Sequence, residues 1–224
     1  MTTTAASRRE AKDALFDGFA TIARALASGR RAEIVELLSQ GERTVDEVAH
    51  EIGQSVANTS HHLRALARAG LVTTRRAGTY VHYRLASTTV VDAWVALRDL
   101  AAERLDALDT LAGAYLGDRD ELETITRDEL HDRLERGDLV LIDVRPEREY
   151  AAGHIPAAIS IPPDRLDHAL DALPDEGDVV AYCRGPYCVY ADDAVRALRA
   201  RGRRALRLED GLPEWRRSGG IVER

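Results

Sequence analysis

Apolar residues recur at spacings of three and four near the start of the chain, which is the pattern of helices with one buried face. A long amphipathic helix is expected over residues 10–28, and it should end at Ser28-Gly29. Its apolar positions are Leu15, Phe16, Phe19, Ile22, Ala23 and Leu26. A second helix is expected over residues 31–38.

A short helix, a glycine-containing turn and a longer helix are predicted next. Residues 44–47, Thr-Val-Asp-Glu, form a capping box that opens a helix through Ala49. Gly53 breaks the chain, and Ser55 caps a helix that runs to about Ala69. This is the helix-turn-helix arrangement, whose second helix enters the major groove of DNA.

Strand-forming residues then occupy 71–76 and 79–85, and they predict a β-hairpin wing that turns at Ala77-Gly78. After the wing, apolar residues at helical spacing form a stripe that is long for so small a domain to cover. These residues are Trp94, Leu97, Ala101, Leu105, Leu108, Leu111 and Tyr115. The stripe is either core of this domain or, as we expect, the seam of a homodimer formed together with the first helix.

In the second half of the chain, short apolar strands alternate with helical segments, which is typical of a parallel sheet covered by helices. Strands are expected at residues 139–143, around 159, at 179–182 and at 204–208, with helices opened by the capping box at Thr126 and over residues 189–201. We therefore expect two domains. A mainly α domain with a wing should occupy residues 1–117, and an α/β domain with a central parallel sheet should occupy residues 118–224.

Length and composition agree with two domains. A chain of 224 residues with 45% hydrophobic and 31% charged residues is long enough to bury two cores. It contains no apolar run of the length that a membrane span needs, and its first residues lack the apolar centre of a signal peptide. We therefore expect a cytoplasmic protein without membrane contacts, in a compartment where thiols are kept reduced.

Charge is distributed unevenly along the chain. Residues 1–117 carry 14 Arg or Lys and 14 Asp or Glu, whereas the remainder carries 17 and 24, so the net charge of −7 belongs to the second half. No carboxylate occurs from Ile52 to Val91. The basic residues of that segment are Arg64, Arg68, Arg75, Arg76 and Arg84, with His61, His62 and His82 among them. This pattern indicates a surface for phosphate groups.

The second helix of the motif resembles that of the winged-helix repressors of the ArsR family. Residues 59–66, Thr-Ser-His-His-Leu-Arg-Ala-Leu, and residues 69–72, Ala-Gly-Leu-Val, carry the resemblance, which covers roughly residues 10–116. It implies a dimer that recognises an inverted repeat in double-stranded DNA. There is no cysteine near residues 44–49, where such repressors often bind metal, so we expect no metal or other cofactor.

On the predicted second helix, Leu63, Leu66 and Ala67 form the buried line and leave the opposite face for DNA. The residues expected at DNA are Ser55, Asn58, Thr59, Ser60, His61, Arg64 and Arg68 on the helix, and Arg75 and Arg76 on the wing. Asn58 suits an adenine edge, and Arg64 suits guanine or phosphate.

Both cysteines of the chain lie in one short loop, residues 183–188, with the sequence Cys-Arg-Gly-Pro-Tyr-Cys. The loop joins a predicted strand to a predicted helix, so we expect the helix start and its unpaired N–H groups to stabilise a thiolate at Cys183. Pro186 has no N–H group, so the amides that can face a bound sulfur are those of Arg184, Gly185, Tyr187 and Cys188.

This loop resembles the active loop of the rhodanese family of sulfur carriers. Leu-Ile-Asp-Val-Arg at residues 141–145, Gly-His-Ile-Pro-Ala-Ala at 153–158 and the segment 208–215 extend the resemblance over about residues 126–222. It implies a persulfide on Cys183, with Cys188 as a second reactive thiol. Asp143 and Arg145, at the end of a predicted strand, either orient the loop or tie down Glu149.

Two departures from the related loops narrow the chemistry. Many catalytic rhodaneses carry an arginine at the sixth loop position, where this chain has Cys188, so thiosulfate turnover is not expected. Phosphatases and arsenate reductases of this fold close a longer loop with an arginine where this chain has Val189, so oxyanion chemistry is disfavoured.

Three hypotheses follow for the function. In the first, a cytoplasmic dimeric repressor senses a small sulfur donor or an oxidant through Cys183 and Cys188. In the second, the chain is a sulfurtransferase whose winged helix dimerises or localises the enzyme. In the third, the repressor uses the same dithiol to trap arsenite.

Overall fold

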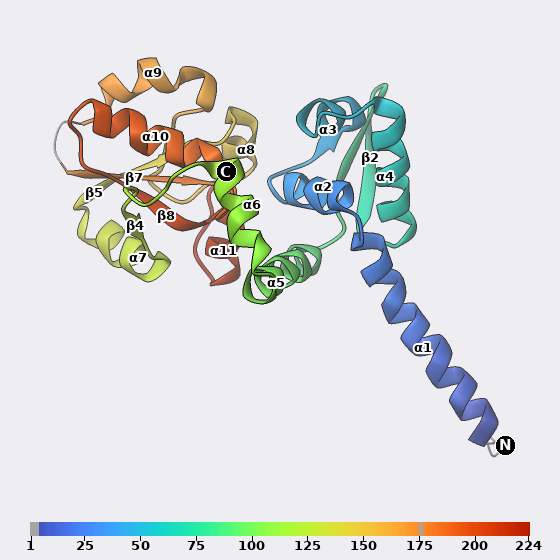
Figure 1. The fold of residues 1–224 in the computed structure, drawn as a ribbon. Coiled ribbons are helices and arrows are strands. Elements are labelled where there is room, and N and C mark those ends of the chain that lie inside the picture. The colour runs from blue at the N-terminus through green and yellow to red at the C-terminus, as the bar shows by residue number, and fades with distance from the viewer. Residues whose placement is uncertain (1–4, 175–176) are drawn as a thin grey trace. The chain divides into compact units, whose positions relative to one another are not determined.

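A computed structural model describes residues 5–174 and 177–224 of the chain (Figure 1). The chain divides into two compact units, residues 1–94 and 95–224. The expected boundary between residues 117 and 118 lies after the last predicted helix of the first domain, whereas the units divide within helix α5. Arg98, on the part of α5 that belongs to the second unit, is buried and ion-paired to Glu214 of the same unit.

The first unit begins with four helices, as predicted. They are α1 (Ala5–Leu26), α2 (Gly29–Ser39), α3 (Val45–Glu51) and α4 (Val56–Arg68). The capping box is confirmed, because the Thr44 side chain accepts from the Glu47 N–H and Glu47 accepts from the Thr44 N–H. Ser55 caps α4 by accepting a 3.2 Å hydrogen bond from the Asn58 N–H. The helix-turn-helix arrangement is therefore present.

The wing is also confirmed, as an antiparallel hairpin of β2 (Val72–Ala77) and β3 (Tyr80–Leu85). A two-residue strand that was not predicted, β1 (Arg43–Thr44), pairs with β3 and completes a sheet of order β1-β3-β2. The core of the unit includes Ile34 of α2, Leu63 and Leu66 of α4, and Val90. Helices and sheet thus share one core that holds α4 in place.

The helical stripe after the wing forms two helices rather than one. Helix α5 (Thr88–Arg104) ends before Asp106, and α6 (Ala107–Leu116) begins after it. Several apolar residues of the stripe are exposed, namely Leu97, Leu105, Leu111 and Tyr115. On α1, Leu15, Phe16, Phe19 and Ile22 are exposed as well, and Figure 1 shows that helix extending away from the other elements of its unit. The prediction that the stripe forms a homodimer seam with the first helix stays a prediction.

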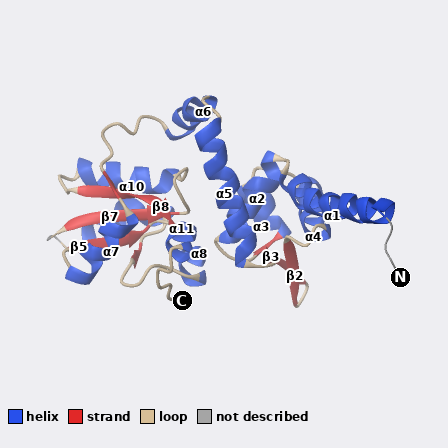
Figure 2. Cartoon of the chain, turned by 90° about the horizontal axis from the view of Figure 1, so that it is seen from below, coloured by secondary structure: helices blue, strands red, loops and turns tan. Residues whose placement is uncertain are grey.

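The second unit holds a five-stranded parallel sheet of order β4-β8-β7-β5-β6, as Figure 2 shows for its central strands. Its elements are β4 (Thr124–Ile125), α7 (Arg127–Arg136), β5 (Leu139–Asp143), α8 (Glu147–Ala152), β6 (Ile159–Ser160), α9 (Leu166–Ala169), β7 (Asp178–Cys183), α10 (Val189–Ala200), β8 (Ala205–Gly211) and α11 (Leu212–Arg217). The four predicted strands and both predicted helices are confirmed. Strand β4 was not predicted.

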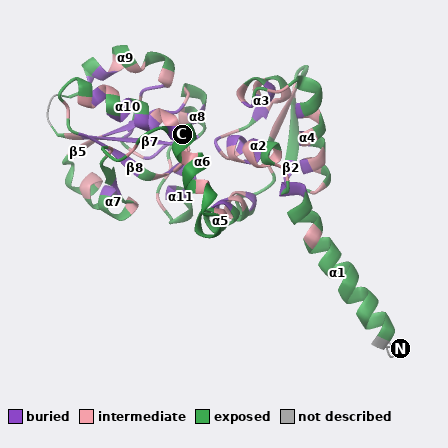
Figure 3. Cartoon of the chain, in the orientation of Figure 1, coloured by how far each residue is buried: buried purple, intermediate pink, exposed green. Residues whose placement is uncertain are grey.

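Alternate residues of β7 enter two different cores, because successive side chains of a strand point to opposite faces of the sheet. Val179, Ala181 and Cys183 pack with α10 on one face. Val180 and Tyr182 pack with residues of α7 and α11 on the other face. Figure 3 shows the central strands buried, as expected for a sheet covered on both faces. Cys183 is therefore placed on the α10 side of the sheet. Among the described residues, no helix is long and apolar enough to cross a membrane.

Candidate functional site

Both cysteines lie where a strand gives way to a helix, and a disulfide joins them. Cys183 is the last residue of β7, and Cys188 is the N-cap residue of α10. Their Cα atoms are 6.2 Å apart, within the range that an unforced disulfide allows. The loop is therefore short enough for the two sulfur atoms to react with each other.

The helix after the loop begins at Val189, as predicted, and Cys188 is its N-cap residue. One detail of the loop differs from the prediction. The Cys188 N–H donates to the Gly185 carbonyl at 3.2 Å, so it is used within the loop rather than offered to a bound sulfur. Cys183 is only 1% exposed, and Cys188 is partly buried. Solvent therefore reaches Cys188 more readily in this disulfide form.

Arg184 holds the loop through a bidentate ion pair with Glu149. Its Nε lies 3.0 Å from Oε2 and its Nη2 lies 2.5 Å from Oε1, and Glu149 is fully buried on α8. The guanidinium also lies over the ring of Tyr190, 5.7 Å from its centroid. The Arg184 side chain thus braces the loop, and the contact of its amide with a bound sulfur stays a prediction.

Gly211 allows the loop to approach β8 at close range. A Cβ atom added to Gly211 would overlap the backbone atoms of Arg184 and Gly185. Since a hydrogen atom is the side chain that fits there, the end of β8 supports the loop directly. Gly211 lies within the segment 208–215 that carries part of the family resemblance, but its contact with the loop was not predicted from the sequence.

Asp143 and Arg145 form a fully buried ion pair beneath the loop. Arg145 Nε lies 3.0 Å from Asp143 Oδ1, and Arg145 Nη2 donates to the Gly153 carbonyl at 2.8 Å. The Tyr182 hydroxyl donates to Asp143 Oδ2 at 2.5 Å. Burial, reinforced by the Asp143 carboxylate, raises the pKa of Tyr182 well above its usual value and keeps this donor protonated. Through the Tyr182 hydroxyl, these two residues brace the strand that ends in Cys183, and their role in orienting the loop stays a prediction.

Arg119, in the connector after α6, is a loop contact that sequence reasoning missed. Its Nη1 donates to the Pro186 carbonyl at 2.8 Å, and its Nη2 donates to the Cys188 carbonyl at 3.4 Å. Its Nε donates to Asp192 Oδ2 at 2.6 Å, and Asp192 is fully buried on α10. No local pattern marked this residue, because it lies more than sixty positions before the loop in a polar segment.

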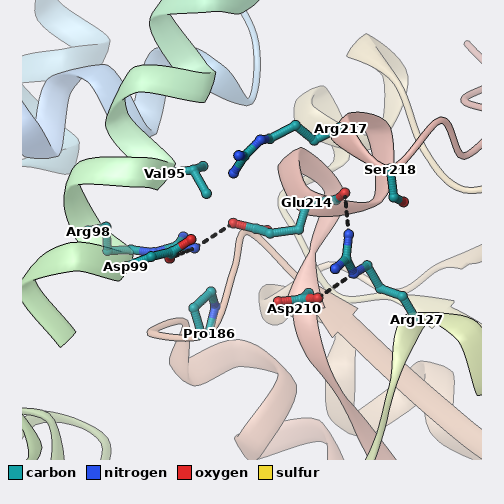
Figure 4. Close-up of a pocket in the computed structure, with 9 residues that line it drawn as sticks. All are labelled: Val95, Arg98, Asp99, Arg127, Pro186, Asp210, Glu214, Arg217 and Ser218. Atoms are coloured by element: carbon teal, nitrogen blue, oxygen red, sulfur yellow. Dashed lines mark hydrogen bonds and ion pairs between the residues drawn. The ribbon is translucent and has the colours of Figure 1, made fainter. Parts of the chain in front are cut away.

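A polar cavity of about 490 Å³ borders the loop at Pro186 (Figure 4). Arg98 faces Glu214 across it at 2.8 Å, and Arg127 lies 2.6 Å from Asp210. Burial raises the pKa of Asp210, and the guanidinium of Arg127 opposes that shift. Positive and negative side chains alternate around this cavity, so its lining offers no net preference for an anion.

The face of α4 predicted to contact DNA is exposed, with one correction. Ser55, Asn58, His61, Arg64 and Arg68 are exposed, and Ser60 is partly buried. Thr59 is fully buried, because its spacing from Leu63 and Leu66 places it on the core side of the helix. The prediction that Thr59 faces DNA is therefore wrong. Arg64 Nε donates to the Ser60 carbonyl at 3.1 Å, so its side chain lies along the helix.

On the wing, Arg75 and Arg76 are exposed, but they differ in their partners. Arg75 forms an ion pair with Glu42, the residue before β1, and its hydrogen bond lowers the pKa of that carboxyl. Arg84, on the partner strand, donates to Thr73 Oγ1 at 3.3 Å. The segment without carboxylates in the sequence thus receives one from Glu42 in the fold.

Comparison with known proteins agrees with this architecture. Residues 28–74 match the model of the bacterial regulatory protein, arsR family, and residues 126–218 match the model of the rhodanese-like domain. The HTH-type transcriptional regulator Rv0324 of Mycobacterium tuberculosis is 45% identical over 97% of this chain and 96% of its own length.

Two further relatives each cover one part of the chain. A sulfurtransferase of Allochromatium vinosum is 34% identical over 37% of this chain and 76% of its own length. The homodimeric winged helix-turn-helix DNA-binding domain of a possible ArsR-family regulator from Mycobacterium bovis is 41% identical over 42% of this chain and 88% of its own, with a TM-score of 0.41. The near full-length match and the two domain matches place this chain in the ArsR family of HTH-type transcriptional regulators, in a form that carries a C-terminal rhodanese-like domain.

Proposed function

We propose that this regulator binds operator DNA as a homodimer and that the thiol state of Cys183 and Cys188 sets its affinity for the operator. The signal is a reactive sulfur species or a thiol oxidant. The observation that carries this proposal is the disulfide between the two ends of the loop, at a Cα separation of 6.2 Å. A carrier loop needs one thiol, whereas a loop that closes on itself needs two.

The exposed face of α4 supports DNA binding. Asn58, His61, Arg64 and Arg68 recur at spacings of three and four, so they share one face of the helix. Arg76 adds an exposed cation on the wing. Such a face combines side chains that read base edges with cations that contact phosphate.

The exposed apolar residues of α1, α5 and α6 support the homodimer. Leu15, Phe16 and Phe19 on α1 are each more than half exposed, and so are Leu111 and Tyr115 on α6. Large apolar side chains concentrated on a few helices favour association rather than exposure to water. A dimer with two recognition helices requires an inverted repeat whose half-sites are about 10 bp apart, or a multiple of that helical turn.

The chemistry of sensing balances with a persulfide or polysulfide as the oxidant. The Cys183 thiolate attacks the sulfane sulfur of the donor, the donor S–S bond breaks, and a thiolate leaves. The Cys188 thiolate then attacks the Cys183 sulfur, displaces hydrosulfide and forms the disulfide. The protein dithiol loses two electrons, and the sulfane sulfur is reduced to sulfide. Since the product is the disulfide form described above, the loop can hold this state without further rearrangement.

The test compares operator binding by the reduced and the polysulfide-treated protein. The operator is a duplex selected from random DNA by the reduced full-length protein. We expect treatment to weaken binding of the wild type about 5-fold or more, the lower end of allosteric coupling, and to leave Cys188→Ser unchanged. Unchanged affinity in the treated wild type, with Cys183 shown by mass spectrometry to be modified, would contradict the proposal.

A second candidate is a sulfurtransferase that carries a persulfide on Cys183. The rhodanese-like match and the sulfurtransferase relative favour it, whereas the cysteine at the sixth loop position does not. Turnover separates the two, because an enzyme passes sulfur to an acceptor many times per chain and a sensor reacts once. Alkylation with mass detection should find the extra sulfur on Cys183, and Cys183→Ser should abolish it.

A further inference from the structure

The connector between α6 and the parallel sheet is tied to the cysteine loop by Arg119. Helix α6 ends at Leu116, so Arg119 lies three residues past the helix. Its guanidinium bonds two carbonyl groups of the loop, those of Pro186 and Cys188, at 2.8 and 3.4 Å. One side chain thus joins the segment that leaves α6 to the segment that carries the disulfide.

The ion pair of Arg119 with helix α10 does not involve the loop. Arg119 also pairs with Asp192, which lies one turn inside α10 and is fully buried. Arg207 lies 3.4 Å from the second carboxylate oxygen of Asp192. The two arginines hold this buried carboxylate in place, so Arg119 is anchored to α10 in either thiol state.

The bonds to the loop, in contrast, depend on the disulfide. The disulfide holds the Cα atoms of Cys183 and Cys188 at 6.2 Å, and the Gly185 carbonyl accepts from the Cys188 N–H inside that ring. Two thiol sulfur atoms cannot remain at bonding distance, so on reduction the two cysteine side chains separate and the covalent bond that closes the loop is lost. The Pro186 and Cys188 carbonyls belong to the segment that this bond constrains, and the hydrogen bonds that they accept are sensitive to direction.

We propose that Arg119 is the positioning residue that transmits the thiol state of the cysteine loop to helix α6. It binds the loop carbonyls in the disulfide form and loses at least one of them in the dithiol form. The change reaches α6 within three residues and alters the presentation of Leu111 and Tyr115, which are exposed on that helix. The effect on DNA rests on the proposed function, but the effect on the loop and on α6 does not.

The chain offers a matched control in Arg196 of α10. Its Nη2 donates to the Asp118 carbonyl at 2.8 Å, so it holds the same connector as Arg119. Its partners Asp118 and Asp193 lie outside the cysteine loop. Arg196→Gln therefore removes a hydrogen bond to the connector but keeps the two hydrogen bonds from Arg119 to the loop carbonyls.

The first measurement is the thiol–disulfide equilibrium of the full-length protein against a glutathione buffer. Coupling is reciprocal, so a residue that responds to the disulfide must also stabilise it. We expect Arg119→Gln to favour reduction about 10-fold, or about 30 mV for a two-electron couple, and Arg196→Gln to match the wild type. Arg119→Lys keeps a charge beside Asp192 and should fold like the wild type, yet it should show most of the shift because an ammonium cannot span three acceptors.

The second measurement is amide hydrogen exchange over residues 107–119 in the oxidised and reduced full-length protein. In the wild type and in Arg196→Gln, we expect the two forms to differ about 5-fold or more at the end of α6. In Arg119→Gln and Arg119→Lys, the two forms should exchange alike. Equal potentials in wild type and both Arg119 variants, or a persisting difference in exchange, would overturn the inference. Neither measurement involves DNA, so an operator affinity that ignores the thiol state would contradict the proposed function alone.

Discussion

The recognition helix and the cysteine loop are built in different ways. Nearly all of the proposed DNA contacts come from one helix and one hairpin, and their side chains point to solvent. The cysteine loop is held instead by Arg119, Glu149 and Gly211, which lie far apart in the sequence and are brought together by the sheet. A change in the recognition helix should therefore act locally on DNA, whereas a change around the loop should act on the stability of the whole second unit.

The largest expected effect tests the buried support beneath the loop. Asp143→Ala removes the carboxylate that pairs with the fully buried Arg145, and breaking such a pair costs about 3–5 kcal/mol in the free energy of unfolding. Glu147→Ala is the control, because its ion pair with Arg165 is exposed and worth about 0–1 kcal/mol. Urea denaturation measures both. Equal losses in the two variants would show that the pair does not support the sheet.

The next effect tests the close approach of β8 to the loop. Gly211→Ala places a Cβ atom against the backbone of Arg184 and Gly185 and should cost about 1–3 kcal/mol in the free energy of unfolding. Gly113→Ala, on α6, makes the same substitution where a Cβ would meet no described atom within 4 Å. It should be neutral or stabilise the helix by about 0.5–1 kcal/mol. A tolerated Gly211→Ala would contradict the close packing of the loop.

The recognition helix should respond through DNA rather than through folding. Arg64→Ala should cost about 1–3 kcal/mol in binding, mainly at one base position of the selected operator. Arg76→Ala should weaken binding to all sequences alike and reduce the slope of log affinity against log salt by about one unit. Titration of operator and random duplexes at several salt concentrations distinguishes the two. If Arg64→Ala loses equal affinity for both duplexes, Arg64 does not read a base.

A smaller effect concerns Arg75, which was expected from the sequence to contact DNA in the same way as Arg76. In the fold, Arg75 is paired with Glu42, so Arg75→Ala should weaken DNA binding less than Arg76→Ala does. Glu42→Gln removes a negative charge beside the wing and releases Arg75, so it should strengthen binding, with a steeper dependence on salt. Unchanged affinity in Glu42→Gln, measured on random duplex at low salt, would place Arg75 away from the phosphate backbone.

The smallest effect is a pH dependence of stability from His62. Burial, with a further contribution from Arg31, lowers the pKa of His62 below its ordinary value of about 6.5. The unfolded chain then binds this proton at a higher pH than the folded chain does. Stability should therefore fall as the pH decreases below about 6.5, and the loss should level off below the folded pKa. His62→Gln should remove this part of the pH dependence, and His61→Gln, on the exposed neighbour, is the matched control.

The sequence by itself determined most of the fold and the location of both candidate sites. The helices, the wing and the parallel sheet follow from the spacing of apolar residues and from helix-capping residues, which are local properties of the sequence. The loop that carries both cysteines was recognised from its six residues. Strands β1 and β4 and the break between α5 and α6 were missed, because two strand residues or one interrupted turn change the apolar pattern very little.

Tertiary structure decided how each site is held. It buried Thr59, since one helical turn separates the DNA face from the core face, and it gave Arg75 a carboxylate from outside the carboxylate-free segment. It placed Asp143 and Arg145 beneath the loop rather than on it, and it brought Arg119 to the loop carbonyls. These partners are set by the order of strands in the sheet. Contacts between residues far apart in the sequence leave no period or spacing, so only the folded chain can show them.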